Sequence, residues 1–522
     1  MRILLRDGDI LDGSGRPAFP GDVWIEDGRI TAVGSLPGRA DAVIDCAGLA
    51  VAPGFIDGHS HSDLQVLENR PEKALQGVTT EIVGNCGFSA YPAPEDRRLL
   101  HEFANGILCG GDAWGWDSAA VYLASAAASS RLVHVVSLVG HGTLRIAFAG
   151  TRLGPLSEHQ LEAMEHALDE SLAAGACGFS TGLMYSPGES APSGELERLC
   201  RVVAQRGKIY ATHMRDYGFR LVEAVEEQLD LARRTGCRLQ ISHFQAVGEA
   251  NWRRQAAALE RIEQARDEGI DVAFDCYPYV AGSTVLTQLL PQWALGGGIP
   301  VLMERLEDPD VRARIARETL ARMAHRWTDL FISSVASSAN QPVVGRSIQE
   351  IASIRGCEPI DAVLDLLAEE RGAVNMLEFN QSLDNLRQTL THPLSNIISD
   401  GFYTTGRPHP RLHGTFPHLL GDICREKRWM ELPEAIRKIT CLPAERFELR
   451  GRGRVAPGYQ ADLVVFDAAR VGSAATYEQP EQPPEGIYYV LRGGEITVHS
   501  RLGTPAPGSP RPLAPGAPLP RS

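Results

Sequence analysis

Hydrophobic residues in this chain change their spacing twice, which divides the sequence into three stretches. Over residues 3–50, short apolar runs alternate with Gly-rich turns, and Asp27-Gly28 between two such runs is typical of a β-hairpin. From about residue 50 to 445, apolar runs alternate with amphipathic segments, which predicts repeated strand–helix units and a parallel sheet. The short-strand pattern then returns, so we predict that the two ends of the chain build one small β-sandwich.

The middle stretch contains eight candidate strands, the number that closes a (β/α)8 barrel. These candidate strands are residues 49–56, 79–83, 132–138, 176–180, 209–212, 239–242, 272–275 and 396–399. A helix is predicted after Ser157, which suits an N-cap. Ser333-Ser334-Val335 is a further strand candidate, so the count of eight is an interpretation.

We therefore predict an α/β fold, with a TIM-like (β/α)8 barrel and a small β-sandwich domain made from both ends of the chain. A chain of 522 residues is long enough for one large domain and a smaller one. The tail is Pro-, Gly- and Ala-rich and is predicted to be disordered. The predicted boundaries are 1–50 with 446–502 for the sandwich, 51–445 for the barrel, about 284–395 for an insertion, and 503–522 for the tail.

Composition narrows the classes of function. The chain is 43% hydrophobic and 22% charged, which is ordinary for a soluble globular protein. A net charge of −14 without a run of Lys and Arg argues against nucleic acid or an anionic membrane as a partner. No apolar stretch is long enough for a bilayer span or a signal peptide. Ten cysteines without a Cys-x-x-Cys pair indicate reduced thiols and a cytoplasmic location. The oligomeric state is left open.

Two histidines follow the first candidate strand of the barrel, in Gly-Phe-Ile-Asp-Gly-His-Ser-His at residues 54–61. In an extended chain, residues two apart point the same way, so His59 and His61 can reach one metal ion. A lone His-x-His pair is a weak signal, and two surface histidines at a strand end would be the better interpretation if no other segment supplied ligands.

Other metal-ligand residue types follow the remaining strands. Enzymes with this barrel place their chemistry at the C-terminal ends of the strands. The residues at those ends include Cys86, His141, His213, His243 and Asp400. Each one alone is more often structural, but together they predict a metal site. Four other histidines fall in helical or loop stretches and are interpreted as unrelated to the site: His101, His159, His166 and His325.

These residue types suit hydrolysis of an amide or a related C–N bond. A zinc ion lowers the pKa of bound water to about 7 and polarises a carbonyl. Asp400 lies between a short apolar strand and Gly401, where its carboxylate could take the proton of that water and deliver it to a leaving amine.

Several separate motifs occur in order along the chain. They are Pro53 to His61, Gly84-Asn85-Cys86-Gly87, Gly182-Leu183-Met184-Tyr185, Asp275-Cys276-Tyr277-Pro278-Tyr279, Ala281-Gly282-Ser283-Thr284, Pro408-His409-Pro410-Arg411 and Gly414-Thr415-Phe416-Pro417. With them, the sequence resembles the amidohydrolase superfamily over nearly its whole length. Within that superfamily it is similar to the N-acyl-D-amino-acid deacylase (D-aminoacylase) group.

The resemblance implies two sets of zinc ligands around one thiolate. The tightly bound zinc would be held by Cys86, His213 and His243. A second site, weaker or empty, would be formed by His59, His61 and Asp400. Many relatives bridge two metals with a carboxylated lysine, and Cys86 would take that place here.

The resemblance also implies substrate contacts for Tyr185, Tyr277 and Ser283, with Tyr277 polarising the carbonyl or binding the carboxylate. One position departs from the group, because Gln245 stands where the pattern carries a lysine that helps to grip the α-carboxylate. Glutamine donates a hydrogen bond but has no charge. Either Arg215 or Arg411 could compensate.

The predicted function is zinc-dependent hydrolysis of an N-acyl-D-amino acid, a small-molecule amide, by attack of metal-bound hydroxide with Asp400 as general base and acid. One alternative is a cyclic amide hydrolase of the hydantoinase or dihydropyrimidinase type, or an N-substituted formamide hydrolase, which Gln245 would favour. The other alternative is a noncatalytic metal- or ligand-binding barrel, which the presence of catalytic residue types disfavours.

Overall fold

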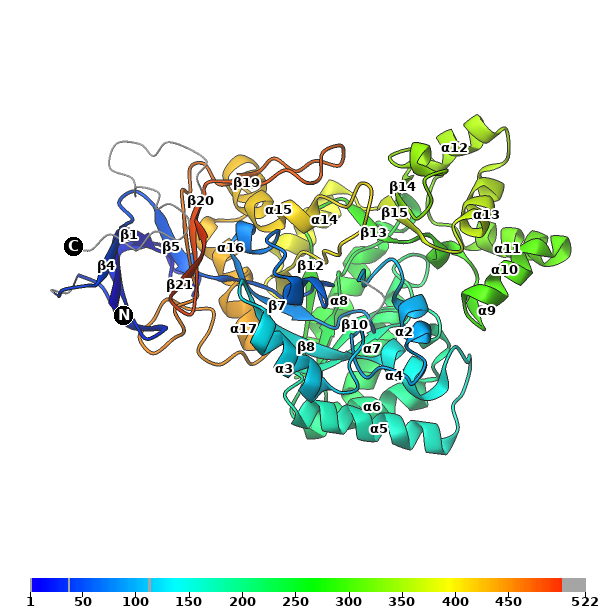
Figure 1. Ribbon diagram of the computed structural model, residues 1–522, viewed down its shortest axis with the longest axis horizontal. Helices are drawn as coiled ribbons and strands as arrows, with labels where there is room; N and C mark the ends of the chain where they lie inside the picture. Colours follow the sequence, from blue (N-terminus) through cyan, green and yellow to red (C-terminus); the bar gives the residue numbers. More distant parts are fainter. Residues whose placement is uncertain (1, 36–37, 111–113, 500–522) are drawn as a thin grey trace.

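A central barrel carries a small sheet at one end and an inserted unit at the other in the computed structural model (Figure 1). The structure describes residues 2–35, 38–110 and 114–499. The tail predicted at 503–522 lies outside these residues. None of the described helices is long and apolar enough to cross a membrane.

Eight parallel strands form the barrel, which confirms the predicted fold class and strand count. The strands are β6 Phe55–Asp57, β7 Val78–Val83, β8 His134–Gly140, β9 Gly178–Gly182, β10 Ile209–His213, β11 Arg238–Ile241, β12 Val272–Cys276 and β16 Ser395–Ile397. The first and last strands meet just past their ends, where the His61 N–H donates to the Gly401 carbonyl at 3.0 Å. This contact places the segments that follow β6 and β16 side by side.

Helices surround the barrel and pack apolar side chains on it. Helix α5, Glu158–Ala173, begins at Ser157 as predicted, because the Ser157 side chain accepts from the Gln160 N–H while the Gln160 side chain accepts in return. The other helices of this part are α1 Gln65–Glu68, α2 Arg97–Ala104, α3 Ala119–Ser129, α4 His141–Ala149, α6 Ser193–Gln205, α7 Leu221–Thr235, α8 Arg254–Asp267, α14 Leu383–Thr391, α15 Arg411–His418, the π-helix η6 Leu419–Glu426, α16 Leu432–Lys438 and α17 Cys441–Arg446.

The single strand predicted at 49–56 is wrong, because two strands of different sheets occupy it. Strand β5, Ala50–Pro53, pairs within the small sheet, and β6 begins the barrel. Gly54 separates them. A Cβ at Gly54 would lie 2.2 Å from Thr79 Oγ1, so no side chain fits where the chain passes between the sheets. An unbroken apolar run cannot reveal such a change of sheet.

The two ends of the chain share one eight-stranded sheet. Its strands are β1 Arg2–Ile10, β2 Phe19–Glu26, β3 Arg29–Val33, β4 Ala42–Asp45, β5, β17 Leu463–Phe466, β20 Ile487–Arg492 and β21 Glu495–His499. The predicted hairpin joins β2 to β3, with positive φ at both Asp27 and Gly28. The Ile30 N–H donates to the Tyr459 carbonyl at 2.9 Å, so the sheet curls round its own apolar core.

A three-stranded antiparallel sheet, here called the inserted sheet, lies beside the barrel mouth. It consists of β13 Ala281–Val285, β15 Val374–Phe379 and β14 Leu330–Val335, in that order. The candidate strand Ser333-Ser334-Val335 belongs to β14 and therefore not to the barrel. The remaining elements are α9 Gln292–Leu295, α10 Ile299–Glu307, α11 Pro309–Arg322, α12 Ile348–Arg355 and α13 Pro359–Glu369, and the short pair β18 Gly472–Ser473 and β19 Pro484–Glu485.

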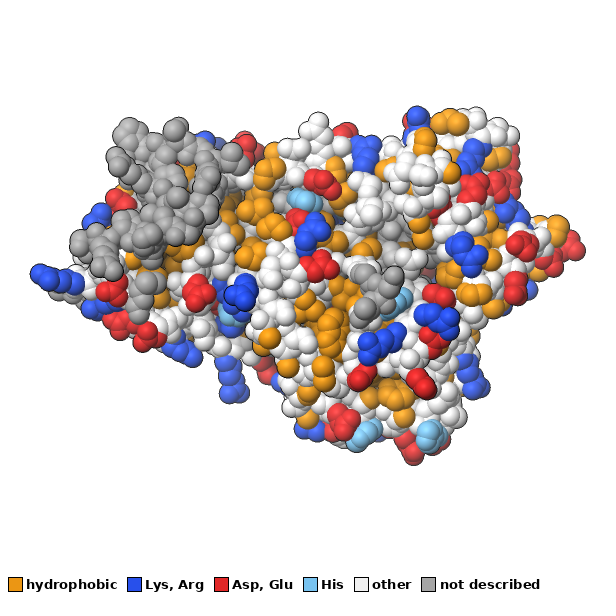
Figure 2. All heavy atoms as spheres, in the orientation of Figure 1, with side chains coloured by type: hydrophobic (Ala, Val, Ile, Leu, Met, Phe, Trp, Pro, Cys, Tyr) orange, Lys and Arg blue, Asp and Glu red, His pale blue; other side chains and the backbone are white. Residues whose placement is uncertain are grey.

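Charged side chains of both signs are interspersed over the face shown in Figure 2. Lys and Arg do not gather into one patch on that face. This distribution matches the sequence, in which no run of Lys and Arg occurs.

Candidate metal centre

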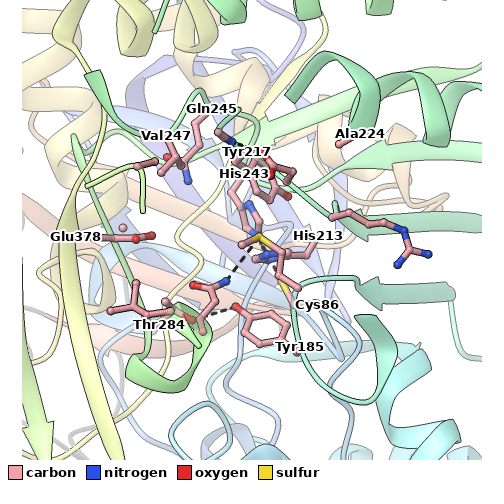
Figure 3. Close-up of a pocket in the computed structure, with 18 of the residues that line it drawn as sticks. Cys86, Tyr185, His213, Tyr217, Ala224, His243, Gln245, Val247, Thr284 and Glu378 are labelled. Atoms are coloured by element: carbon pink, nitrogen blue, oxygen red, sulfur yellow. Dashed lines mark hydrogen bonds between the residues drawn. The ribbon is translucent and has the colours of Figure 1, made fainter. Parts of the chain in front are cut away.

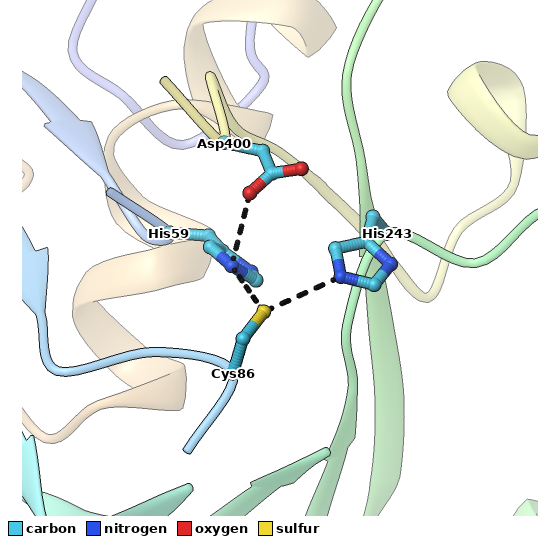
Figure 4. Close-up of side chains that lie close together, drawn as sticks. All are labelled: His59, Cys86, His243 and Asp400. Atoms are coloured by element: carbon cyan, nitrogen blue, oxygen red, sulfur yellow. Dashed lines mark hydrogen bonds and ion pairs between the residues drawn. The ribbon is translucent and has the colours of Figure 1, made fainter. Parts of the chain in front are cut away.

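Four buried side chains from four different strand ends gather at the mouth of the barrel (Figure 4). Each offers one ligand atom, and these atoms all lie within 4.8 Å of one another. We call this group the ligand cluster: His59 after β6, Cys86 after β7, His243 after β11, and Asp400 after β16.

The spacing within the ligand cluster fits a zinc ion. Cys86 Sγ lies 3.2 Å from His59 Nε2 and 3.5 Å from His243 Nε2. His59 Nε2 lies 3.3 Å from Asp400 Oδ1. Tetrahedral zinc, with Zn–S near 2.3 Å and Zn–N near 2.0–2.1 Å, requires ligand atoms about 3.3–3.6 Å apart. The donor types and their separations therefore match what zinc needs.

The other two predicted ligands lie at the edge of the cluster. His61 Nε2 is 3.3 Å from Asp400 Oδ1, and His213 Nδ1 is 3.1 Å from His243 Nε2. All six predicted ligands thus converge. The tightest group draws on both predicted sets, so the division of the ligands into a tight and a weak site stays a prediction.

Burial keeps the imidazoles of His213 and His243 in the neutral form that binds metals, whereas the charges of Cys86 and Asp400 raise the pKa of His59. Burial lowers the pKa of His243 to about 4 and, together with the neighbouring His243, lowers that of His213 well below its usual value. Neutral imidazole has the free lone pair that coordination requires. Burial also raises the pKa of Cys86, an effect that a bound cation reverses because a coordinating thiol is deprotonated.

Three members of the cluster have left-handed backbone conformations, which are rare for residues other than glycine. The φ angles are 52° at Cys86, 34° at His243 and 49° at Asp400. The chain packs closely at Cys86, because a Cβ at Gly182 would lie 2.0 Å from the Cys86 carbonyl oxygen. Such strain persists only where packing fixes it, and it concentrates at functional sites.

Asp275, in strand β12, contacts two of the histidines. Its Oδ1 accepts from the backbone N–H of His243 at 2.5 Å and lies 3.5 Å from the ring Nδ1 of His59. A carboxylate beside the ring nitrogen of a metal-binding histidine commonly fixes the orientation of the ring, which fits His59. Sequence reasoning gave Asp275 no role, and the one available signal was an acidic residue inside a buried strand.

Asp400 is held as a carboxylate. Burial opposes its ionisation, but Arg411 and His59 outweigh burial and keep the pKa of Asp400 well below its usual range. Arg411 Nη1 lies 3.0 Å from Asp400 Oδ2, and the Arg411 residue is only 1% exposed. An aspartate in this state is ready to accept a proton.

A cavity of about 840 Å³ opens beside the cluster, and all four predicted substrate-contact residues line it (Figure 3). The Tyr277 hydroxyl donates to Gln245 Oε1 at 3.1 Å, and the Tyr185 hydroxyl lies 3.1 Å from Thr284 Oγ1. Ser283, in β13, presents one edge of the inserted sheet to the same cavity. Their contact with a substrate remains a prediction.

Three residues considered in the sequence analysis lie outside the ligand cluster. His141 pairs with Glu195, Nε2 to Oε1 at 2.7 Å, away from the cluster. Arg215 is bound to Glu227 at 2.8 Å, so of the two arginines considered only Arg411 reaches the cluster. His325, interpreted as unrelated to the site, lines the cavity. It is not part of the ligand cluster, and it reaches the cavity because the inserted sheet, whose position the sequence did not reveal, brings the adjoining loop to the mouth.

Comparison with known proteins gives one consistent result. Residues 42–498 match the model of the amidohydrolase family. An N-acyl-D-glutamate deacylase and a D-aminoacylase, both from Alcaligenes xylosoxydans xylosoxydans, are 37% and 35% identical to this chain. Each alignment covers 94% of this chain, with 92% and 93% of the two relatives. A crystal structure of N-acyl-D-glutamate deacylase from Bordetella bronchiseptica contains zinc and a phosphonate inhibitor, and its sequence is 34% identical to this chain. The two structures superpose with a TM-score of 0.81, and the alignment covers 97% of this chain and 98% of that one.

Proposed function

The chain belongs to the amidohydrolase family, and from this premise we propose that it hydrolyses N-acyl-D-amino acids to a carboxylate and a D-amino acid, with zinc as its cofactor. The named deacylases that align with nearly the whole chain support this substrate class. The observation that carries the proposal is the convergence of Cys86, His243 and Asp400 beside one cavity.

The zinc ligands we propose are those expected from the sequence. Cys86, His213 and His243 would hold the tightly bound ion. His59, His61 and Asp400 would form a second, weaker site around the same thiolate. A bound zinc lowers the pKa of a coordinated water and polarises the amide carbonyl.

Asp400 is proposed as the general base and acid. Its Oδ1 faces His59 and His61 at 3.3 Å, so this oxygen lies where the attacking water must be. Because Arg411 keeps the carboxylate ionised, Asp400 can take the proton of that water. The same carboxyl group then returns the proton to the leaving nitrogen as the amide bond breaks.

Arg411 is the cation that we propose for the α-carboxylate of the substrate. Gln245 carries no charge, and its side-chain oxygen already accepts from Tyr277. Arg411 Nε is buried without a hydrogen-bond partner among the described residues, and its guanidinium lies 4.8 Å from the Tyr277 ring centroid. Arg411, Tyr277 and Ser283 together would grip the carboxylate, while Tyr185 would contact the carbonyl side.

The test is the D400N substitution in zinc-loaded protein. We expect N-acetyl-D-amino acids to be hydrolysed in preference to their L-enantiomers, and D400N to lower kcat by roughly 10²- to 10⁴-fold while zinc stays bound. D216N, at the mouth of the same cavity, serves as the control. Full activity of D400N would refute the role of Asp400, and activity on L-substrates alone would refute the substrate class.

The cyclic-amide and formamide alternatives remain distinguishable in the same assay. Faster hydrolysis of hydantoins, dihydropyrimidines or N-substituted formamides than of any N-acetyl-D-amino acid would favour them. We also propose a cytoplasmic location, based on ten cysteines that are all free thiols, eight of them buried.

A further inference from the structure

One carboxylate, Glu378, faces the cavity from the inserted sheet (Figure 3). It lies on β15 directly opposite Gly282 of β13. A Cβ at Gly282 would lie 2.9 Å from Glu378 Oε1, so the carboxylate occupies the space that any other residue at 282 would fill. The antiparallel pairing therefore aims Glu378 at the substrate side of the sheet.

Few positive charges are available to neutralise Glu378. Among the described residues, His325 is the basic side chain within 4.0 Å of it, with Nε2 at 3.2 Å from Oε2. Arg411 pairs with Asp400 and is proposed above to hold the α-carboxylate, and the position that would carry a lysine in the family pattern is Gln245. Glu378 therefore has no lysine or arginine within 4.0 Å among the described residues.

A second polar group lies beside the carboxylate without a partner. Asn380 is 1% exposed, and neither its Nδ2 nor its Oδ1 has a hydrogen-bond partner among the described residues. Its Nδ2 would lie 3.2 Å from a Cβ at Gly282, which places the amide next to Glu378. A buried amide without partners is costly, and its two polar atoms differ: Oδ1 can accept a hydrogen bond, whereas Nδ2, the atom placed beside Glu378, can only donate.

Glu378 is also within electrostatic reach of the proposed substrate contacts. Burial raises the pKa values of Tyr185 and Tyr277 well above their usual value, and the charge of Glu378 adds to both shifts. The carboxylate is therefore close enough to act on a substrate that those two tyrosines hold.

A second, mainly apolar cavity adjoins Tyr185 and indicates where the acyl group of the substrate binds. A smaller cavity of about 90 Å³ shares Ile107, Met184, Tyr185 and Gln288 with the main one. Its other lining residues include the apolar Phe88, Phe103, Val285, Leu295 and Ile299, and also the polar Glu102 and Asn105. A mainly apolar space suits the acyl group. The side chain of the amino acid would then extend toward Glu378.

Resting on the proposed deacylase function, we infer that Glu378 makes this enzyme select N-acyl-D-amino acids with a cationic side chain, such as D-lysine or D-arginine. An ammonium or guanidinium group can donate to the Glu378 carboxylate, which lines the cavity. The side-chain carboxylate of D-glutamate or D-aspartate would instead meet Glu378 with no lysine to compensate, and like charges at such a site disfavour binding.

The experiment compares three substrates of similar length with the zinc-loaded enzyme: N-acetyl-D-lysine, N-acetyl-D-norleucine, which lacks the ammonium group, and N-acetyl-D-glutamate. We expect kcat/KM for the lysine derivative to exceed that for the norleucine derivative by roughly 10- to 100-fold, and the glutamate derivative to be poorest. In E378Q the lysine-to-norleucine ratio should fall to near one, and the glutamate derivative should improve. E378D, which keeps the charge, should keep the preference.

The matched control is E223Q, which removes a carboxylate of α7 that lines the same cavity. It should leave the ratio as in the parent enzyme. Equal ratios in the parent and in E378Q, or glutamate as the best substrate of the parent, would overturn the inference while leaving the deacylase function intact. Hydrolysis of none of the three derivatives would overturn the proposed function and this inference with it.

Discussion

The ligand cluster and the inserted sheet face each other across one cavity, yet they are built differently. The cluster residues lie just past the ends of parallel barrel strands and are buried, and three of the four have left-handed backbone conformations. The inserted sheet is antiparallel and presents a half-buried serine, a glycine and the longer side chain of Glu378. The barrel therefore positions the residues proposed for the reaction. The insertion, whose length can vary without disturbing the barrel, can select the substrate.

The largest effect should come from removing the ligand that both proposed zinc sites share. C86A should lose zinc and reduce hydrolysis to background, because thiolate is the anionic ligand of the tight site. Metal analysis after gel filtration, together with the rate for N-acetyl-D-norleucine, checks this. The control is C276A, another buried thiol on the neighbouring part of the barrel. Retention of about one zinc per chain in C86A would contradict the account.

The second largest effect should come from a substitution of Arg411, which contacts both the ligand cluster and the inserted sheet. Arg411 lies 3.0 Å from Asp400 in the cluster and donates from Nη2 to the Ser283 carbonyl of the inserted sheet at 3.2 Å. R411Q should lower kcat/KM by roughly 10²-fold or more, since truncating one member of a buried charge pair is costly.

The pH profile separates this role from loss of packing. Arg411 lowers the pKa of Asp400, so its removal raises that pKa, and the active carboxylate is then lost at a higher pH. The acid limb of kcat/KM should therefore move to higher pH in R411Q. R425Q, away from the cavity, is the control. An unshifted acid limb would show that Arg411 does not act on Asp400.

A smaller effect should come from the inserted sheet alone. G282A places a Cβ within 2.9 Å of Glu378 Oε1, and the flexible carboxylate should turn away. We expect the preference for the lysine derivative to fall severalfold while zinc content stays the same. The control is G194A, because Gly194 is an exposed residue of α6 and a Cβ there would meet open space. Loss of zinc from G282A would mean that the two regions are not separable.

The smallest effect should be on stability, at the barrel rim. Burial raises the pKa of Glu189 to about 8, although Arg322 and Arg215 oppose this shift. A carboxyl whose folded pKa is raised costs stability as the pH climbs from its unfolded pKa of about 4.3 toward 8. E189Q should therefore raise Tm by about 1–2 °C at pH 9 and by less at pH 5. An equal gain at both pH values would contradict this, and E223Q again provides the exposed control.

The sequence was sufficient for the barrel and for the residue types that gather at its mouth. The proposed ligands Cys86, His213 and Asp400 lie at or shortly after the ends of apolar strands, and the barrel topology brings consecutive strand ends to one mouth. The switch of sheets at Gly54 was missed because β5 and β6 form one apolar run. Only the clash with Thr79, a tertiary contact, separates them.

The wall of the cavity formed by the inserted sheet was much harder to predict from the sequence. Glu378 enters the site through its register with Gly282, and His325 through a loop beside the same sheet. Pairing between antiparallel strands so far apart in sequence has no local pattern. Asp275 was missed for a related reason, since its role depends on His59 and His243 lying above it.

The central claim is that Cys86 and several histidines bind one zinc ion at the barrel mouth. X-ray absorption spectroscopy at the zinc edge measures this directly on the purified protein. We predict one sulfur neighbour at about 2.3 Å with nitrogen or oxygen neighbours at about 2.0–2.1 Å, and loss of the sulfur signal in C86S. A zinc environment without sulfur in the parent protein would contradict the account.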